Sequence, residues 1–184
     1  MSINYSDFEK MMNWFNKLKR NRNKKIFSRT NCTESDLVQY SVDHLEAAEK
    51  LYELSDRFTW QYLHSTVFLS HLSIELLLKA CLLHLEDEFP AEHNLKQLFK
   101  RLRKKGIELS GQNKKWLNYL SNCNELRYPN PESKLKVDLN QWKKTKALFE
   151  ELRMNVPKEI QKMIVMHERY RSNVKSDKTI WPEK

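Results

Sequence analysis

The residues best suited to chemistry fall in three short stretches of this chain. Glu75 and Lys79 lie in the apolar run SIELLLKACLL, His93 lies in PAEHNLKQL, and Arg127 and Tyr128 lie in NELRYPNP. Residues four apart share one face of a helix, so Glu75 and Lys79 can pair. A charge in an apolar run needs such a partner, because an unpaired buried charge costs several kcal/mol. The spacing predicts an ion pair with at least one partly buried member.

These five residues are our candidates for binding a nucleotide or a phosphate. The planar guanidinium of Arg127 can bind either a carboxylate or a phosphate through two parallel hydrogen bonds. We favour a structural contact with Glu75, and a ligand phosphate is the alternative. His93 is interpreted first as a helix-start or packing residue, and Tyr128 as a residue that packs over a helix end or stacks on a base. We assign no catalytic residue.

Metal and cofactor sites are not predicted. His71 and Glu75 have the four-residue spacing of a metal-binding pair, but no HExxH motif or third ligand accompanies them. The only glycines are Gly106 and Gly111, so a phosphate-cradling loop or a dinucleotide fingerprint cannot be built. So few glycines, with five prolines, also disfavour an all-β fold, which needs many tight turns.

The three cysteines, Cys32, Cys81 and Cys123, fit no paired metal-ligand spacing and leave an odd thiol. Unpaired thiols favour a reducing compartment, so we expect a cytoplasmic protein. Cys81 lies in an apolar run and is expected in the core. The N-terminus lacks the pattern of a signal peptide, and the longest apolar run is too short to cross a membrane.

The net charge of +9 is unevenly distributed. Residues 31–95 are acidic, whereas residues 1–30, 96–115 and 134–184 are basic. Basic strips of this kind suit a polyanion such as RNA, although a solvated helix face is the commoner interpretation of any one strip. The candidate nucleic-acid contacts are Lys17, Lys19, Arg20, Arg22, Lys100, Arg101, Arg103, Lys104 and Lys105.

Helical periodicity runs through most of the chain, which predicts an all-α antiparallel bundle of four to five helices with an extra N-terminal helix. We expect an amphipathic helix over residues 7–20. A second helix is expected over 34–54, with the capping residues Thr33 and Asp36 at its start. The central helix of the bundle is expected over 58–89. Further helices are expected over 93–106, 114–128 and 139–170, the last kinked at Pro157 rather than divided. We divide the chain into an N-terminal helix and basic linker (1–30), the bundle (31–172) and a loose tail (173–184).

The order of three pieces carries a family resemblance. SIELLLKACLL, then PAEHNLKQL, then NELRYP resembles the HEPN family, the higher eukaryotes and prokaryotes nucleotide-binding domains, over residues 36–170. The resemblance implies a helical bundle that is usually dimeric. Many members are ribonucleases, often toxins or defence proteins, with a histidine four to six residues after an arginine. Others lack that pair and act as partners of small nucleotidyltransferases, or as nucleotide-binding or scaffolding modules.

This chain departs from the nuclease pattern after Arg127. The next six residues, YPNPES, include no histidine, and the next histidine in the chain is His167. We therefore expect a non-catalytic, dimeric module that binds a nucleotide or a protein partner such as a small nucleotidyltransferase. The alternatives are an RNA-binding protein or a ribonuclease with a displaced base, and the separated pair Arg57 and His64 is most simply coincidence. A scaffold docking through its acidic block is a further alternative.

Overall fold

Helices make up nearly all of the structure, a computed structural model that describes residues 26–30, 32–58, 62–123 and 140–176. The described helices are α2 (Glu34–Phe58), α3 (Leu63–Glu86), α4 (Leu95–Arg103), α5 (Gly111–Asn122), α6 (Gln141–Asn155) and α7 (Lys158–Ser176). Two short strands, β1 (Ile26–Ser28) and β2 (Glu88–Pro90), complete the described part. The all-α class is confirmed. The predicted N-terminal helix and the basic linker up to residue 25 lie outside the described residues. Helix α7 continues to Ser176, so the first four residues of the predicted loose tail 173–184 are helical, and the rest of that tail lies outside the described residues.

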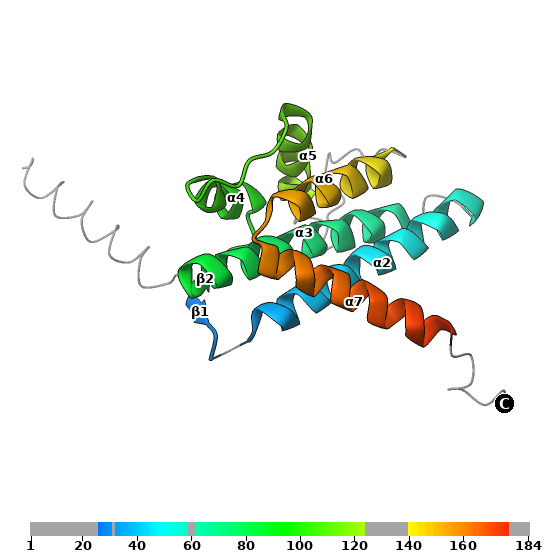
Figure 1. Cartoon of the computed structure of the whole chain (residues 1–184). Helices are drawn as coiled ribbons and strands as arrows, with labels where there is room; N and C mark the ends of the chain where they lie inside the picture. The colour runs from blue at the N-terminus through cyan, green and yellow to red at the C-terminus, as the bar shows by residue number, and fades with distance from the viewer. Residues whose placement is uncertain (1–25, 31, 59–61, 124–139, 177–184) are drawn as a thin grey trace, which may run out of the picture.

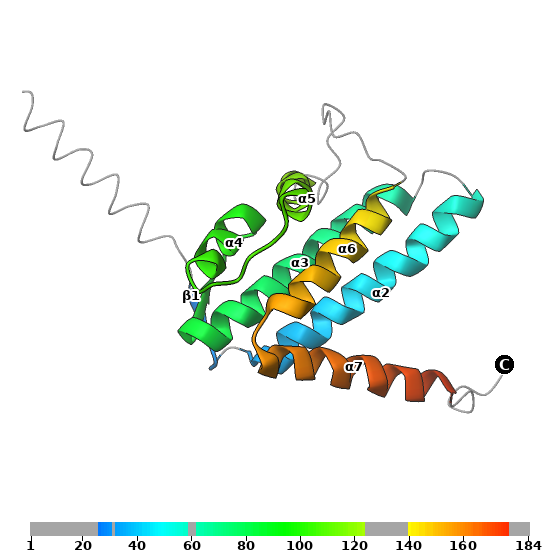
Figure 2. The same cartoon turned by 45° about the horizontal axis from the view of Figure 1, so that its top comes forward.

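Helix α3 is the centre of the bundle, as predicted. It contacts α2, α4, α5 and α6, with α2 along one side and α4 and α5 on the other (Figures 1 and 2). Every residue from Leu77 to Leu83 is buried, including the thiol-bearing Cys81. Among the described helices α3 alone is long and apolar enough to cross a membrane, and 78% of that stretch is buried inside the bundle. That burial is what a core helix shows.

The end of α3 differs from the prediction that helix continues to residue 89. Asp87 adopts a left-handed backbone conformation with φ 60, which ends the helix. β2 then pairs antiparallel with β1, with Phe27 opposite Phe89, and their rings stack with centroids 5.4 Å apart. Residues 26–28 therefore form a strand, whereas the sequence predicts a basic linker there.

The starts of α2 and α5 are fixed by side-chain caps. The backbone N–H of Thr33 donates to Asp36 Oδ2 over 2.8 Å, and the N–H of Asp36 donates to Thr33 Oγ1 over 3.2 Å. This reciprocal pair confirms the predicted start of α2. Helix α5 begins three residues earlier than predicted because Ser110 accepts a hydrogen bond from the N–H of Asn113.

Two helices, not one kinked helix, occupy the C-terminal part. Val156 is extended, with ψ 164, because a residue that precedes proline avoids the helical region. Helix α7 starts again after Pro157 and packs mainly on α2 (Figure 2). Two aromatic residues that follow the helical phase of their segments are exposed, Tyr40 on α2 at 57% and Tyr170 on α7 at 71%.

Candidate functional site

The candidate site is a cluster of charged side chains centred on Glu75 of α3. Lys79 Nζ lies 2.6 Å from Glu75 Oε1, so the predicted ion pair is confirmed. Both side chains are buried, at 3% exposure for Glu75 and 6% for Lys79. His93, just before α4, brings its Nδ1 to 2.9 Å from the same carboxylate oxygen. The three residues that sequence analysis placed in one site are therefore in contact.

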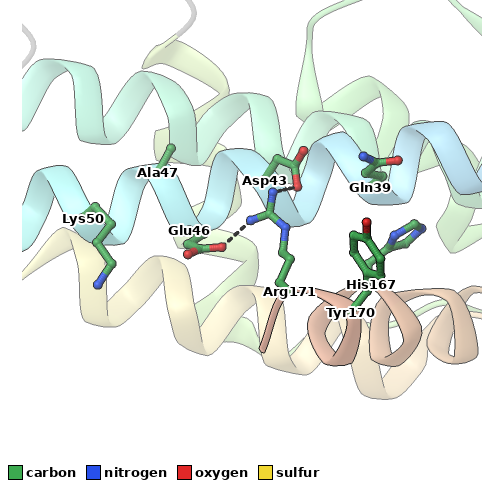
Figure 3. Close-up of a pocket in the computed structure, with 8 residues that line it drawn as sticks. All are labelled: Gln39, Asp43, Glu46, Ala47, Lys50, His167, Tyr170 and Arg171. Atoms are coloured by element: carbon green, nitrogen blue, oxygen red, sulfur yellow. Dashed lines mark hydrogen bonds and ion pairs between the residues drawn. The ribbon is translucent and has the colours of Figure 1, made fainter. Parts of the chain in front are cut away.

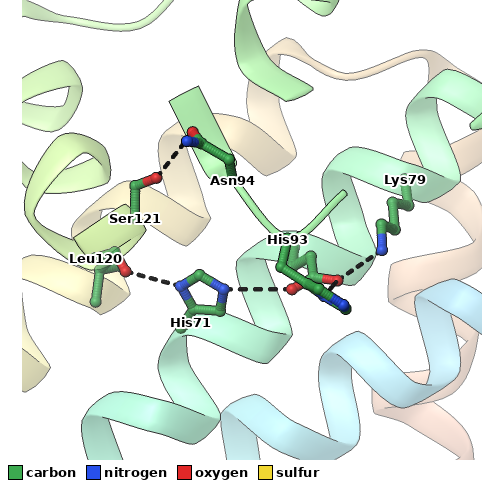
Figure 4. A network of polar contacts seen from close by, with 7 residues as sticks. His71, Lys79, His93, Asn94, Leu120 and Ser121 are labelled. Carbon is green, nitrogen blue, oxygen red and sulfur yellow. Dashed lines mark hydrogen bonds and ion pairs between the residues drawn. The ribbon is translucent and has the colours of Figure 1, made fainter. Parts of the chain in front are cut away.

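His71 is a fourth member of this cluster. Its ring is wholly buried, and its Nδ1 donates a hydrogen bond to the backbone carbonyl of Leu120, 2.7 Å away at the end of α5 (Figure 4). Its Nε2 faces Glu75 Oε2 at 3.3 Å. The spacing of His71 to Glu75 is evident in the sequence, where it is examined only as a possible metal pair. The link from His71 to α5 has no local sequence signal.

The position of hydrogens in this cluster follows from its geometry. A carbonyl oxygen only accepts hydrogen bonds, so Nδ1 of His71 must carry the hydrogen that it donates to Leu120. Nε2 of His71 and Oε2 of Glu75 have no other hydrogen-bond partner among the described residues. Two lone pairs facing each other would repel, so the contact is attractive only when a hydrogen lies between them.

The pKa of Glu75 sets the charge at the centre of the cluster. Burial of the carboxyl raises its pKa, but the hydrogen bond from His71 and the charges of Lys79 and His93 outweigh burial and lower the pKa from 4.5 to about 2. The carboxyl is therefore ionised at neutral pH. One carboxylate is then surrounded by three basic side chains, which are the ammonium of Lys79 and the imidazoles of His71 and His93.

The cluster reaches solvent at His93, whose side chain is 42% exposed. The next residue, Asn94, caps α4 by accepting from the N–H of Gln97 over 3.3 Å, and it also accepts from Ser121 Oγ over 3.1 Å (Figure 4). A helix N-terminus favours anions. The Glu75 cluster and the start of α4 therefore meet beside one exposed imidazole.

Several predicted site residues lie outside the described residues. These are Arg127, Tyr128, Lys17, Lys19, Arg20 and Arg22. Among the described residues no group of three or more His, Cys, Asp or Glu side chains is arranged to hold a metal ion.

The basic strip of α4 divides into paired and unpaired cations. Arg101 contacts Glu86 and Glu88, Lys105 contacts Glu86, and Arg103 contacts Glu108. Lys100 and Lys104 have no ion pair among the described residues. These two lysines line a groove of about 290 Å³ with Arg101, beside Ile26 of β1. A polyanion would therefore find cations without an ion-pair partner among the described residues over only part of the predicted basic strip.

Acidic side chains of α2 are covered in part by α7. Arg171 of α7 inserts its guanidinium between Asp43 and Glu46, at one side of a groove of about 490 Å³ (Figure 3). On the other side of the same arginine, Lys146 contacts Glu49 at 3.2 Å. Because these carboxylates already have cationic partners, the groove offers little attraction to a charged ligand.

The fold and the cluster together define an all-α bundle with a buried carboxylate, ammonium and imidazole network on its central helix. The family model described as HEPN domain matches residues 35–154, and the chain belongs to that family. No curated protein and no solved structure matches it. Family membership indicates a function related to nucleotides or RNA, and the match begins with α2 and ends within α6.

Proposed function

We propose that this chain is a non-catalytic HEPN module that binds the phosphate of a nucleotide at the His93 end of the buried cluster. The observation that carries the proposal is the group of three basic side chains around Glu75, which reaches solvent at His93 beside the start of α4. Lack of a histidine soon after Arg127 supports binding without cleavage. Arg127 would supply a second phosphate contact.

Binding of a mononucleotide, measured by calorimetry with the wild-type chain and His93→Ala, tests this proposal. Loss of one charge-assisted contact should weaken binding about tenfold. Glu75 retains Lys79 and His71 in this variant, so the fold should persist. His64→Ala is the matched control, because His64 is an exposed histidine at the start of α3. Equal affinities for wild type and His93→Ala would disprove the assignment.

Catalysis is tested with the same proteins. We expect no metal-independent RNA cleavage by the wild type. If the wild type cleaves RNA and Arg127→Ala abolishes the cleavage, the chain is a ribonuclease rather than a binding module. If His64→Ala abolishes the cleavage, His64 is the displaced base.

The proposed module is a cytoplasmic homodimer whose protein partner is a small nucleotidyltransferase in a toxin–antitoxin or defence context. Support comes from the family, whose members often pair in this way. Sedimentation at high concentration tests dimerisation, and a monomer there would contradict it. Co-purification with a small nucleotidyltransferase from the same organism tests the partner, and failure of the two chains to associate when co-expressed would count against it.

A second candidate function is RNA binding through α4. Lys100 and Lys104 favour it, because their ammonium groups line one groove without a carboxylate partner among the described residues. The double variant Lys100→Ala and Lys104→Ala should weaken RNA binding and reduce its salt dependence, since each phosphate contact releases counterions. Arg103→Ala, which removes a cation already paired with Glu108, is the control. Affinity that does not change with salt would exclude this function.

A further inference from the structure

His93 connects the buried cluster to solvent through the two nitrogens of one ring. Its Nδ1 lies 2.9 Å from Glu75 Oε1, and its side chain reaches the surface, whereas that of Glu75 does not. Because the ionised carboxylate only accepts hydrogen bonds, Nδ1 of His93 carries the hydrogen of this contact. The other nitrogen, Nε2, is left for a ligand.

The negative charge of Glu75 is already balanced without His93. Lys79 Nζ lies 2.6 Å from Oε1, the same carboxylate oxygen that His93 contacts, and both members of this ion pair are buried. One carboxylate cannot balance two positive charges, and like charges in a poorly solvated site disfavour each other. A proton added to His93 therefore has no counter-charge of its own in the protein alone.

Other groups around His93 do not supply that counter-charge. His71 contacts the second oxygen of Glu75 at 3.3 Å and is itself a base. Lys96, in the first turn of α4, is a cation whose Nζ lies 3.3 Å from Asn122 Oδ1, and the last turn of α5 has no charged residue. Among the described residues, Glu75 is the only carboxylate in contact with His93.

A phosphate would supply the missing negative charge at Nε2 of His93. A neutral imidazole that donates from Nδ1 presents a lone pair at Nε2, which repels an anionic oxygen, whereas an imidazolium donates a hydrogen there. A phosphate monoester carries nearly two negative charges at neutral pH, and a phosphodiester carries one. The monoester dianion therefore gains the most from a proton on His93.

We propose that the His93 site binds a phosphate monoester as its dianion and takes up a proton with it, on Nε2 of His93. The proton comes from solvent, and no covalent bond of the ligand forms or breaks. In the complex, the imidazolium lies between two anions, the Glu75 carboxylate at Nδ1 and the phosphate at Nε2. Binding therefore weakens as the pH rises. This inference rests on the proposed function, because it concerns the same site.

Calorimetry with adenosine monophosphate counts the protons that binding takes up. The second pKa of a phosphate monoester is about 6, so at pH 8 the nucleotide is already a dianion and brings no proton. Comparing the binding enthalpy in Tris and in HEPES gives the number of protons exchanged with the buffer. An imidazole ordinarily titrates between about pH 5 and 8, so we expect uptake of about one proton per nucleotide at pH 8. Affinity should be about tenfold weaker at pH 8.5 than at pH 7.

His93→Gln separates proton uptake from the rest of binding. The amide can still donate a hydrogen bond to Glu75 but cannot gain a charge. We therefore expect weaker binding at pH 7, no proton uptake, and the same affinity at pH 7 and pH 8.5. His64→Gln is the matched control, because His64 is an exposed histidine at the start of α3. It should keep the proton uptake and the pH dependence of the wild type.

Two further probes test the charge and the source of the ligand. Cyclic adenosine monophosphate, a diester with the same base, should bind at least about tenfold more weakly than adenosine monophosphate. Inorganic phosphate separates a nucleotide from a free phosphate ion. If inorganic phosphate binds as tightly as adenosine monophosphate and with proton uptake, the charge chemistry proposed here is supported and the nucleotide function is contradicted.

Three results would overturn the inference while leaving the proposed function in place. These are binding of adenosine monophosphate without proton uptake, unchanged proton uptake in His93→Gln, and cyclic adenosine monophosphate binding as tightly as the monoester. If neither adenosine monophosphate nor inorganic phosphate binds at millimolar concentration, both the inference and the proposed function are wrong.

Discussion

Glu75→Gln removes the negative charge at the centre of the buried cluster while keeping the size of the side chain. Lys79 and His71 would then face a neutral amide inside the bundle. Removing one partner of a buried ion pair costs about 3–5 kcal/mol of unfolding free energy. The pKa of Glu75 provides a second estimate. Its fall from 4.5 to about 2 corresponds to about 3 kcal/mol.

The pH dependence of this contribution has a definite sign. Because the folded pKa of Glu75 is below its unfolded value, the unfolded state binds the proton more tightly. The stabilisation is complete above pH 4.5, falls as the pH drops towards about 2, and is lost below that value. The glutamine variant has no such group. The stability difference between the two proteins should be about 3 kcal/mol at pH 7 and about 2 kcal/mol at pH 3.5.

Urea denaturation followed by far-ultraviolet circular dichroism at the two pH values measures this difference. Glu53→Gln is the control, because Glu53 is 55% exposed and pairs only with Lys50 among the described residues, so no measurable loss is expected. A cost for Glu75→Gln that is the same at both pH values, or below about 1 kcal/mol at pH 7, would refute the account of the buried charge.

Three further variants test how the bundle is held together. His71→Leu should cost about 1–3 kcal/mol in urea denaturation, because it leaves a buried carbonyl of α5 without its donor, and a stability equal to wild type would contradict the link. Thr145→Val should cost about 1–3 kcal/mol by orphaning the indole N–H of Trp116, whereas Thr145→Ser should not. Gly106→Ala should lower stability by about 1 kcal/mol, because φ is +89 there. Gly111→Ala is the control, since the backbone of Gly111 has an ordinary φ and no loss is expected. Thermal unfolding of the two variants measures the difference.

Local sequence signals predicted most of the helices. The capping pair Thr33 and Asp36 is found where it was expected, and the leucine stripe of α4 is buried. These features depend on residues a few positions apart, so a single sequence contains the information. The ion pair of Glu75 and Lys79 was predictable for the same reason.

Features that depend on distant residues were not predictable. Nothing in SHLSI shows that His71 will meet a carbonyl of α5, since the partner is a backbone atom 49 residues away. Phe27 and Phe89, which pair between the two strands, are also far apart in the sequence, and their pairing overrides the helical pattern at the end of α3. Tyr170 follows the helical phase of its segment, but the break before Pro157 turns its face away from the core.

The docking of α7 has a consequence for the order in which the chain folds. Arg171 meets Glu46 across 125 residues, whereas α2 and α3 are neighbours in the chain. Closing so long a loop costs entropy before any contact compensates it. We therefore expect α7 to dock late in folding and to detach first under mild denaturant. Amide hydrogens of α7 should then exchange faster than those of α3, because the core residues of α3 are exposed to solvent only when the whole bundle unfolds.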